Sequence, residues 1–301
     1  MRAKDHRVTD RVSARLCALT EGLHDQLDGS SLARLCENIL PLIHNASPEA
    51  DPLSMPAEQV REKMAKGEPL LFGLELVIDI SALRDLMIRL AGAYVNHYNT
   101  AEKEDRETPR AVVALLIRTA LEENRLDAGE LLQKVISGDK KAVESAALAL
   151  GLDPGLLRTI ALNALKPVLR HWQRSLTPLA AGIAWDKGYC FICGSRASIG
   201  ELRDDNQQKH LRCGTCGADW QYHRLQCVYC GNENHKSLGY LYPEGQHGSL
   251  RVEYCEKCRG YIKLITSFSP NSPESLDIED IATIHLDCIA RERGYINGII
   301  I

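Results

Sequence analysis

The chain has 301 residues, 45% of them hydrophobic and 25% charged, which is the ordinary mix of a folded globular protein. Its formal net charge of −4 argues against a dedicated binder of nucleic acid or of an anionic membrane. No uncharged apolar stretch reaches the roughly 18 residues that a bilayer span needs, so no membrane span is expected. The first residues, MRAKDHRVTDRV, lack the apolar run of a secretory signal, and we expect a cytoplasmic protein.

Residues 1–185 predict an all-helical domain. Hydrophobic side chains recur at helical spacing over residues 31–44 and 81–98. Residues 53–68, which contain Pro56 and Gly67, are expected to be a loop around one short helix. Helix-start signals are Thr108 with Pro109, Asp127 with Glu130, Asp139, and Asp153 with Pro154. They predict helices over residues 109–121, 127–137, 139–151 and 153–172.

After residue 185 the chain predicts short strands, because glycine, tyrosine and asparagine replace helix formers. The alternating runs are residues 198–202, 210–212, 219–222, 238–242 and 249–254. The last two are expected to form a hairpin around Pro243, Glu244 and Gly245. A linker over residues 269–275 then precedes a helix over residues 278–293.

Eight of the eleven cysteines form four Cys-x-x-Cys pairs, all between residues 190 and 258. Inserts of 19 and 24 residues separate the first pair from the second and the third from the fourth, whereas 10 residues separate the second from the third. Two residues between cysteines let one tight turn present both sulfurs to one ion, and two turns joined by a hairpin complete a tetrahedral site. The predicted ligands are Cys190, Cys193, Cys213 and Cys216 in one site, and Cys227, Cys230, Cys255 and Cys258 in the other.

The predicted fold class is α+β, with an N-terminal all-α domain, two tandem rubredoxin-like or zinc-ribbon β modules and a C-terminal helix. The expected boundaries are residues 1–185, 186–224, 225–268 and 269–301. Each module is expected to bind one tetrathiolate ion, iron or zinc, because both metals suit this geometry. Glycine follows the second cysteine in three pairs, but Arg259 follows Cys258 and the glycine is displaced to Gly260.

Thioredoxin-like redox chemistry also uses a Cys-x-x-Cys pair, but it places the pair at the start of a helix in a βαβ setting. An iron–sulfur cluster is an alternative, although the compact C-x₂-C-x₂-C run of bacterial ferredoxins is absent. The remaining cysteines, Cys17, Cys36 and Cys288, lie on apolar helical faces and are interpreted as small core residues.

No nucleotide-binding, hydrolase or metalloprotease motif is present, and a closed tetrathiolate site leaves no position for a substrate, so no enzymatic activity is expected. The joint between the modules mixes aromatic and arginine side chains, which are enriched at binding hot spots. Trp220, Tyr222, His223 and Arg224 are therefore candidate partner-binding residues. Packing of these side chains between the modules is the alternative.

Several motifs resemble one known family. They are CFICGS at residues 190–195, the run Trp220 to Cys230, EYCEKCRGYIK at residues 253–263 and DIAT at residues 280–283. From about residue 189 to 295 the chain resembles the formate dehydrogenase accessory protein (FdhE) family. The resemblance implies a cytoplasmic, non-catalytic maturation factor that binds the catalytic subunit of a molybdenum- or tungsten-containing formate dehydrogenase and holds rubredoxin-like metal, expected to be iron. A rubredoxin-type electron-transfer protein and a nucleic-acid-binding zinc ribbon are the alternatives.

Overall fold

The computed structural model describes residues 29–47, 50–74, 77–100, 110–204, 206–243 and 248–297. The chain divides into two compact units. The first contains Met1–Pro52 and Gly73–His171, and the second contains Leu53–Phe72 and Trp172–Ile301. The structure thus differs from the predicted boundary at residue 185, because the segment Leu53–Phe72 belongs to the unit that carries the strands.

The first unit is helical, as the sequence predicts. Its helices are α2 (Gly29–His44), α4 (Ile80–Thr100), α5 (Arg110–Glu122), α6 (Ala128–Ile136), α7 (Lys140–Ala149) and most of α8 (Pro154–Leu176). Fully buried side chains such as Met87, Leu90 and Ile117 form its core. The carboxylate of Asp127 accepts a hydrogen bond of 2.9 Å from the backbone N–H of Glu130, which confirms the predicted helix start. Thr108 and Pro109 lie outside the described residues.

Within the described part of the chain, no single helix is both long and apolar enough to span a membrane. Helix α7 with the chain from Pro154 to Ala180 passes the same test only as a pair, and that pair is bent by 119°.

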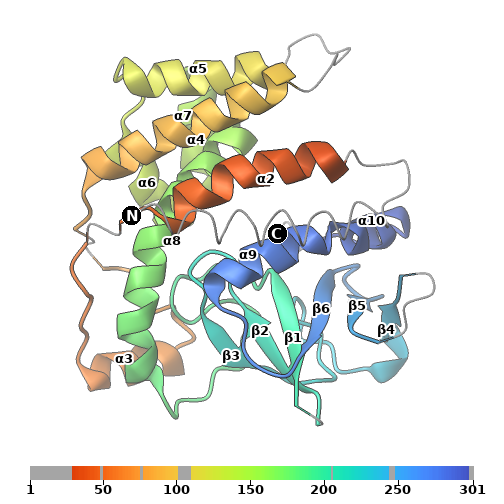
Figure 1. Ribbon diagram of the computed structural model, residues 1–301. Helices are drawn as coiled ribbons and strands as arrows, with labels where there is room; N and C mark the ends of the chain where they lie inside the picture. Colours follow the sequence, from red (N-terminus) through yellow and green to blue (C-terminus); the bar gives the residue numbers. More distant parts are fainter. Residues whose placement is uncertain are drawn as a thin grey trace. The chain divides into compact units, whose positions relative to one another are not determined.

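The second unit contains one six-stranded sheet (Figure 1). The strands are β1 (Ile199–Arg203), β2 (Gln208–Arg212), β3 (Asp219–Gln221), β4 (Leu238–Leu241), β5 (Leu250–Cys255) and β6 (Tyr261–Ser267). Their order is β3-β2-β1-β6-β5-β4, and all neighbours are antiparallel except β1 and β6, which are parallel. The two predicted modules therefore join edge to edge into one sheet.

The sequence pattern did not predict β6. Its first five residues, Tyr261 to Ile265, are all buried, so the strand lacks the alternation of apolar and polar residues that marks a half-exposed strand. The predicted hairpin is confirmed, because β4 pairs with β5 in antiparallel register from Leu238 opposite Cys255. Glu244 and Gly245, at its expected tip, lie outside the described residues.

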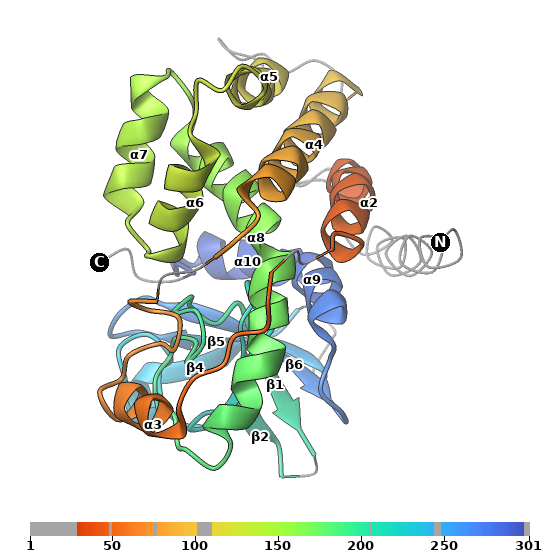
Figure 2. The same cartoon turned by 90° about the vertical axis from the view of Figure 1, so that its left-hand side faces the viewer.

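Three helices accompany the sheet: α3 (Ala57–Ala65), α9 (Pro273–Ala282) and α10 (Ile284–Glu292). Helices α9 and α10 lie along the sheet (Figures 1 and 2), where Leu276 packs on Ile199 and Ile265. The predicted C-terminal helix is thus two helices that meet at Thr283. Ser272 begins the first of them, because its hydroxyl accepts a hydrogen bond from the N–H of Ser275, so the second half of the predicted linker is a helix start.

Buried ion pairs replace part of the apolar core of the sheet. Glu201 has no exposed surface and accepts hydrogen bonds of 2.8 Å from Arg212 and 2.9 Å from the side chain of Asn271. Burial opposes ionisation of Glu201, but the hydrogen bond from Arg203 and the charge of Arg212 outweigh it and lower the carboxyl pKa. Lys209 on β2 pairs with Glu253 on β5, which links the two modules across the sheet.

The modules also approach each other closely at Gly188. A Cβ atom at this position would lie 1.7 Å from the carbonyl oxygen of Val228, in the third cysteine turn. We therefore expect Gly188→Ala to destabilise the second unit by about 1–3 kcal/mol, the range found for overpacked sites. Gly248→Ala is the matched control, because a Cβ there meets no atom within 4 Å. Thermal unfolding of both variants measures the difference, and equal stabilities would contradict this contact.

Candidate metal centres

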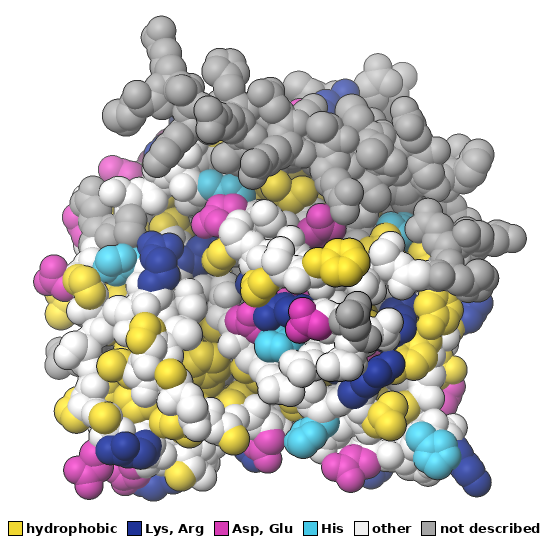
Figure 3. Space-filling view, turned by 60° about the horizontal axis from the view of Figure 1, so that its bottom comes forward, with side chains coloured by type: hydrophobic (Ala, Val, Ile, Leu, Met, Phe, Trp, Pro, Cys, Tyr) yellow, Lys and Arg dark blue, Asp and Glu magenta, His cyan; other side chains and the backbone are white. Residues whose placement is uncertain are grey.

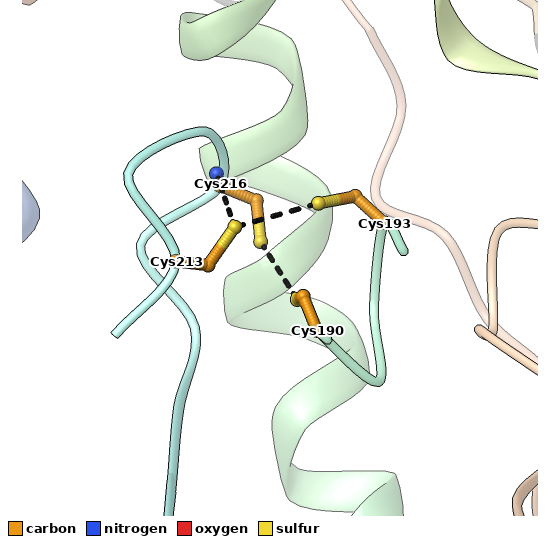
Figure 4. A group of neighbouring side chains, drawn as sticks. All are labelled: Cys190, Cys193, Cys213 and Cys216. Atoms are coloured by element: carbon orange, nitrogen blue, oxygen red, sulfur yellow. Dashed lines mark hydrogen bonds between the residues drawn. The ribbon is translucent and has the colours of Figure 1, made fainter. Parts of the chain in front are cut away.

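The first cysteine cluster contains Cys190, Cys193, Cys213 and Cys216 (Figure 4). One pair lies on the turn before β1 and the other on the turn between β2 and β3. All four Sγ atoms lie within 4.8 Å of one another, with separations of 3.4 Å from Cys190 to Cys216 and 3.5 Å from Cys193 to Cys213. A tetrahedron with metal–sulfur bonds of about 2.3 Å has edges of about 3.8 Å, so the cluster has the size that one ion requires.

The second cluster contains Cys227, Cys230, Cys255 and Cys258. Its first pair lies between β3 and β4, and its second pair begins at the end of β5. The Sγ atoms of Cys227 and Cys258 are 3.6 Å apart, and those of Cys230 and Cys255 are 3.8 Å apart. The two groups of four are those that the sequence pairing predicts. That these cysteines bind a metal stays a prediction. The size of both clusters and their four sulfur ligands fit it.

The four cysteine turns share one backbone geometry. In each turn the N–H of the first cysteine donates to the carbonyl five residues later, at distances of 2.8 to 2.9 Å. The residue after the second cysteine has a positive φ: 73° at Gly194, 79° at Gly217, 66° at Gly231 and 57° at Arg259. Arg259 therefore adopts the left-handed conformation itself. Gly260, which follows it, is needed for a different reason, the lack of space for a side chain. A Cβ at Gly260 would lie 2.5 Å from the ring of Tyr229.

Contacts of its side chain compensate the left-handed backbone of Arg259. The guanidinium lies 4.0 Å from the ring centre of Tyr295 and donates to Glu256 and to the carbonyl of Arg293. The carbonyl of Arg259 accepts a hydrogen bond of 2.8 Å from the N–H of Ile296. The fourth turn is thus tied to the residues that follow α10.

The thiols differ in acidity when no metal is bound. Burial raises the pKa of Cys190 and of Cys216, whereas hydrogen bonds from the neighbouring sulfurs lower that of Cys213. In the second cluster, burial raises the pKa of Cys258 to about 11. Burial also opposes ionisation of Cys255, but backbone hydrogen bonds from Cys258 and Lys257 outweigh it and lower the pKa. Because thiolates bind metal, an ion that enters either cluster releases protons.

The segment Leu53–Phe72 supports the first cluster. Sequence analysis predicted the cluster but missed this supporting contact. The N–H groups of Leu70 and Leu71 donate to the carbonyls of Phe191 and Ile192, at 2.7 and 3.0 Å. The ring of Phe72 lies against Gly194, where a Cβ would approach it to 2.9 Å. Leu70 and Leu71 expose 0% and 2% of their surface, although prolines and glycines surround them in sequence. Two adjacent leucines just after the expected loop were the available signal.

The second cluster is the more exposed of the two. Cys193 is the one partly exposed cysteine of the first cluster, whereas Cys230 and Cys258 are both partly exposed in the second. We therefore expect a zinc-loaded protein to release zinc to a coloured chelator in two phases, with the second centre in the faster phase. Variants that keep a single centre assign the phases. Cys193→Ser with Cys216→Ser should keep only the fast phase, and a slow release from that variant would contradict the assignment.

The candidate partner-binding residues divide into two pairs. Trp220 and Tyr222 expose only 6% and 7% of their surface. The indole of Trp220 donates to the carbonyl of Lys187, and the hydroxyl of Tyr222 donates to the carbonyl of Cys227. Tyr222 therefore contacts the second module, whereas Trp220 packs within the first, against Lys187 and Phe191. A role in partner binding stays a prediction for these residues. His223 and Arg224 are exposed, and Arg224 contacts Gln207 at 3.2 Å.

The other cysteines do not join either cluster. Cys36 is buried in α2, which agrees with a core role, and Cys288 on α10 is partly exposed. Cys17 lies outside the described residues. Each Cys-x-x-Cys pair lies on a turn rather than at the start of a helix, which does not fit the thioredoxin-like alternative.

The structure thus combines a helical unit with a sheet that carries two Cys₄ clusters, and each cluster is a candidate tetrathiolate metal centre. Residues 225–299 match the family described as "FdhE, C-terminal domain". The chain is 32% identical over 170 residues to an FdhE homologue of Aquifex aeolicus, a match that covers 56% of this chain and 59% of that protein. It is 26% identical over 285 residues to an FdhE homologue of Pseudomonas aeruginosa, which covers 86% and 91%.

The fold agrees with a solved structure, the crystal structure of the FdhE protein from Pseudomonas aeruginosa. That likeness has a TM-score of 0.58 at 24% identity and covers 96% of this chain and 93% of the other. The comparisons confirm the resemblance seen in the sequence motifs: the chain is similar to FdhE proteins. A homologue of Stutzerimonas stutzeri is 33% identical over 176 residues, and the chain spans 56% of its length. The domain match includes the second cluster and begins after the first, at residue 225.

Proposed function

We propose that the protein is a cytoplasmic, non-catalytic accessory factor for the maturation of a formate dehydrogenase, and that it binds the catalytic subunit of that enzyme. The observation that carries the proposal is the combination of two Cys₄ clusters with the match to the FdhE C-terminal domain. The formate dehydrogenase partner follows from the family resemblance of the sequence motifs.

In this proposal the two ions stabilise the binding scaffold. Four thiolates fill the tetrahedral coordination of a zinc or iron ion, so each cluster would hold its ion without an open position. Each ion would join two turns that lie far apart in sequence, and the sheet between the turns holds buried charges as well as apolar side chains. Small modules of this kind usually require such additional stabilisation. The proposed ion is iron or zinc, and elemental analysis of the purified protein distinguishes the two.

Within the proposed interface, His223 and Arg224 are the contact residues and Trp220 and Tyr222 hold them in place. The burial of the two aromatic side chains and the exposure of the other two support this division. Since arginine is enriched at binding hot spots, Arg224 is the more important of the exposed pair.

The test is affinity capture from the native host, with the tagged protein as bait and the formate dehydrogenase catalytic subunit as the expected prey. Deletion of the gene should also abolish formate dehydrogenase activity, and the wild-type gene should restore it. His223→Ala with Arg224→Ala should weaken capture by about tenfold while both ions stay bound. Absence of the subunit from the captured proteins, with normal enzyme activity in the deletion strain, would refute the proposed function.

The same preparation separates the two alternative functions. A coloured protein with reversibly reducible iron would favour rubredoxin-type electron transfer. Salt-dependent binding to DNA or RNA would favour a nucleic-acid ribbon. The ribbon region from 186 to 263 has 11 Lys and Arg residues against 9 Asp and Glu residues, and this near-neutral charge supports neither a DNA nor an RNA surface.

A further inference from the structure

The second unit carries an open apolar groove that the metal centres do not use. Its volume is about 740 Å³, within the range of pockets that hold ligands. Figure 3 shows hydrophobic side chains gathered around a hollow on the face of the molecule that comes forward in that view. The walls are Met64 on α3, the chain from Thr177 to Asp186, and residues of the first module that include Phe191, Trp220 and Tyr222.

The groove suits an extended polypeptide better than a small polar molecule. Most lining residues are apolar, and they lack the cluster of converging charged groups that fixes a small polar ligand. One wall, residues 183–187, has no helix or strand assignment. Ala184 in this wall is exposed, and within the described part of the chain its backbone N–H has no hydrogen-bond partner. Such a wall can pair with the backbone of an added strand.

The charges that line the groove indicate which kind of segment it binds. Asp186 and Asp219 line the groove, and no Lys or Arg is among the lining residues. Asp219 is already paired with Arg203 and His210. Among the described residues, Asp186 forms its ion pair with Lys187, at 3.0 Å, and both side chains are well exposed, so this pair is weak and easily exchanged. An apolar segment with an adjacent lysine or arginine complements this surface.

The floor of the groove belongs to the first cysteine turn. Phe191 lies between Cys190 and Cys193, and its ring packs edge-to-face against Trp185 at 6.5 Å and Trp220 at 6.4 Å. The indole of Trp185 donates to the carbonyl of Tyr189 in the same turn, at 2.7 Å. The position of these rings therefore depends on the geometry of the first metal centre.

We propose that this groove binds an extended apolar segment of the client polypeptide that carries an adjacent lysine or arginine, and that the first metal centre keeps the groove in its binding shape. The inference rests on the proposed accessory function, because an incompletely assembled subunit exposes apolar segments of this kind. It extends the proposed contact surface from His223, which also lines the groove, to the apolar walls.

The test uses the full metal-loaded chain and a fluorescent peptide with a short run of leucine and phenylalanine followed by two arginines. A peptide of the same apolar run with two glutamates is the comparison. Fluorescence anisotropy should show that the arginine peptide binds at least about tenfold more tightly than the glutamate peptide. Asp186→Lys should remove most of this preference, whereas Glu144→Lys, the same change at an exposed position of α7, should leave it intact.

A steric variant tests the site itself. Ala184→Trp fills the groove from an exposed position, and Ala149→Trp makes the same change at an exposed position of α7. We expect the first to weaken peptide binding and capture of the formate dehydrogenase subunit by at least about tenfold, and the second to change neither. Cys193→Ser with Cys216→Ser should also weaken peptide binding. Circular dichroism and metal content verify that the Ala184 and Asp186 variants are folded.

The outcomes separate the two proposals. If the wild-type protein binds no peptide, or if Ala184→Trp binds it equally well, the proposal that the groove is a peptide site is wrong. Loss of peptide binding with unchanged subunit capture would overturn its role with the client and leave the accessory function standing. Peptide binding without any capture of the subunit by the wild type would refute the accessory function instead. A change of sedimentation in Ala184→Trp would identify a second copy of this chain as the occupant, against the proposal.

Discussion

Replacement of Cys193 and Cys216 with serine is expected to lower the metal content from two ions per chain to one. These residues supply one sulfur from each turn of the first cluster, and two remaining thiols cannot complete a tetrathiolate site. The ion in the second cluster should stay, because its four sulfurs come from other turns. Elemental analysis measures the loss, and hydrogen exchange should show faster opening of residues 190–216.

Serine at Cys36 or Cys288 is the matched control, because neither thiol belongs to a cluster. Both controls should keep two ions. The helices of the first unit should retain their protection in the double variant, since their core contains no cysteine of either cluster. Retention of two ions by the double variant would show that the first cluster is not a metal centre.

Lys209→Met is expected to cost about 3–5 kcal/mol of stability, the range for a buried ion pair that loses one partner. The side chain of Lys209 is fully buried and pairs with Glu253, whose side chain is 6% exposed. Burial already raises the pKa of Glu253 more than Lys209 lowers it. Without the lysine, the carboxylate loses its ion-pair partner and keeps only the weaker attraction of Arg251, so its pKa should rise further. Urea denaturation followed by tryptophan fluorescence measures the change.

The pH dependence of this defect has a definite sign. A carboxyl group whose pKa is raised by folding favours the folded state when protonated and opposes it when ionised. The defect of Lys209→Met, measured against the wild type at the same pH, should therefore shrink as the pH falls toward the pKa of Glu253. Adding Glu253→Gln to the variant should recover much of the stability, because no buried charge remains. A defect that is independent of pH and unchanged in the double variant would point to lost packing instead.

Local patterns explain what the sequence could predict. Two residues between cysteines define a turn whose geometry needs no information from elsewhere in the chain, and all four turns follow it. The helix starts at Asp127 and Asp139 are also local, because each carboxylate bonds an N–H three residues later. The grouping of the turns into two fours follows from hairpin-length inserts.

Contacts between distant segments explain what the sequence could not predict. Leu70 and Leu71 reach the first cysteine turn across more than a hundred residues, and no spacing pattern announces the contact. The pairing of β1 with β6 joins the two modules through an interface inside the sheet, which hydrophobic alternation cannot reveal. The burial of Trp220 and Tyr222 likewise depends on distant residues, because Trp220 packs on Phe191 and Tyr222 lies over Lys209. The left-handed conformation of Arg259 was hidden because the residue type disfavours it.

The parallel pairing of β1 with β6 also sets an order of assembly during synthesis. Strands β1 and β2 are adjacent in sequence and can pair as soon as they leave the ribosome, whereas the other edge of β1 must wait for Tyr261–Ser267. Until then the edge of Ile199–Arg203 presents unpaired backbone groups that could template pairing with another chain. A nascent chain that pauses before β6 is therefore itself vulnerable to aggregation, and it becomes safe only when nearly all of its residues have been made.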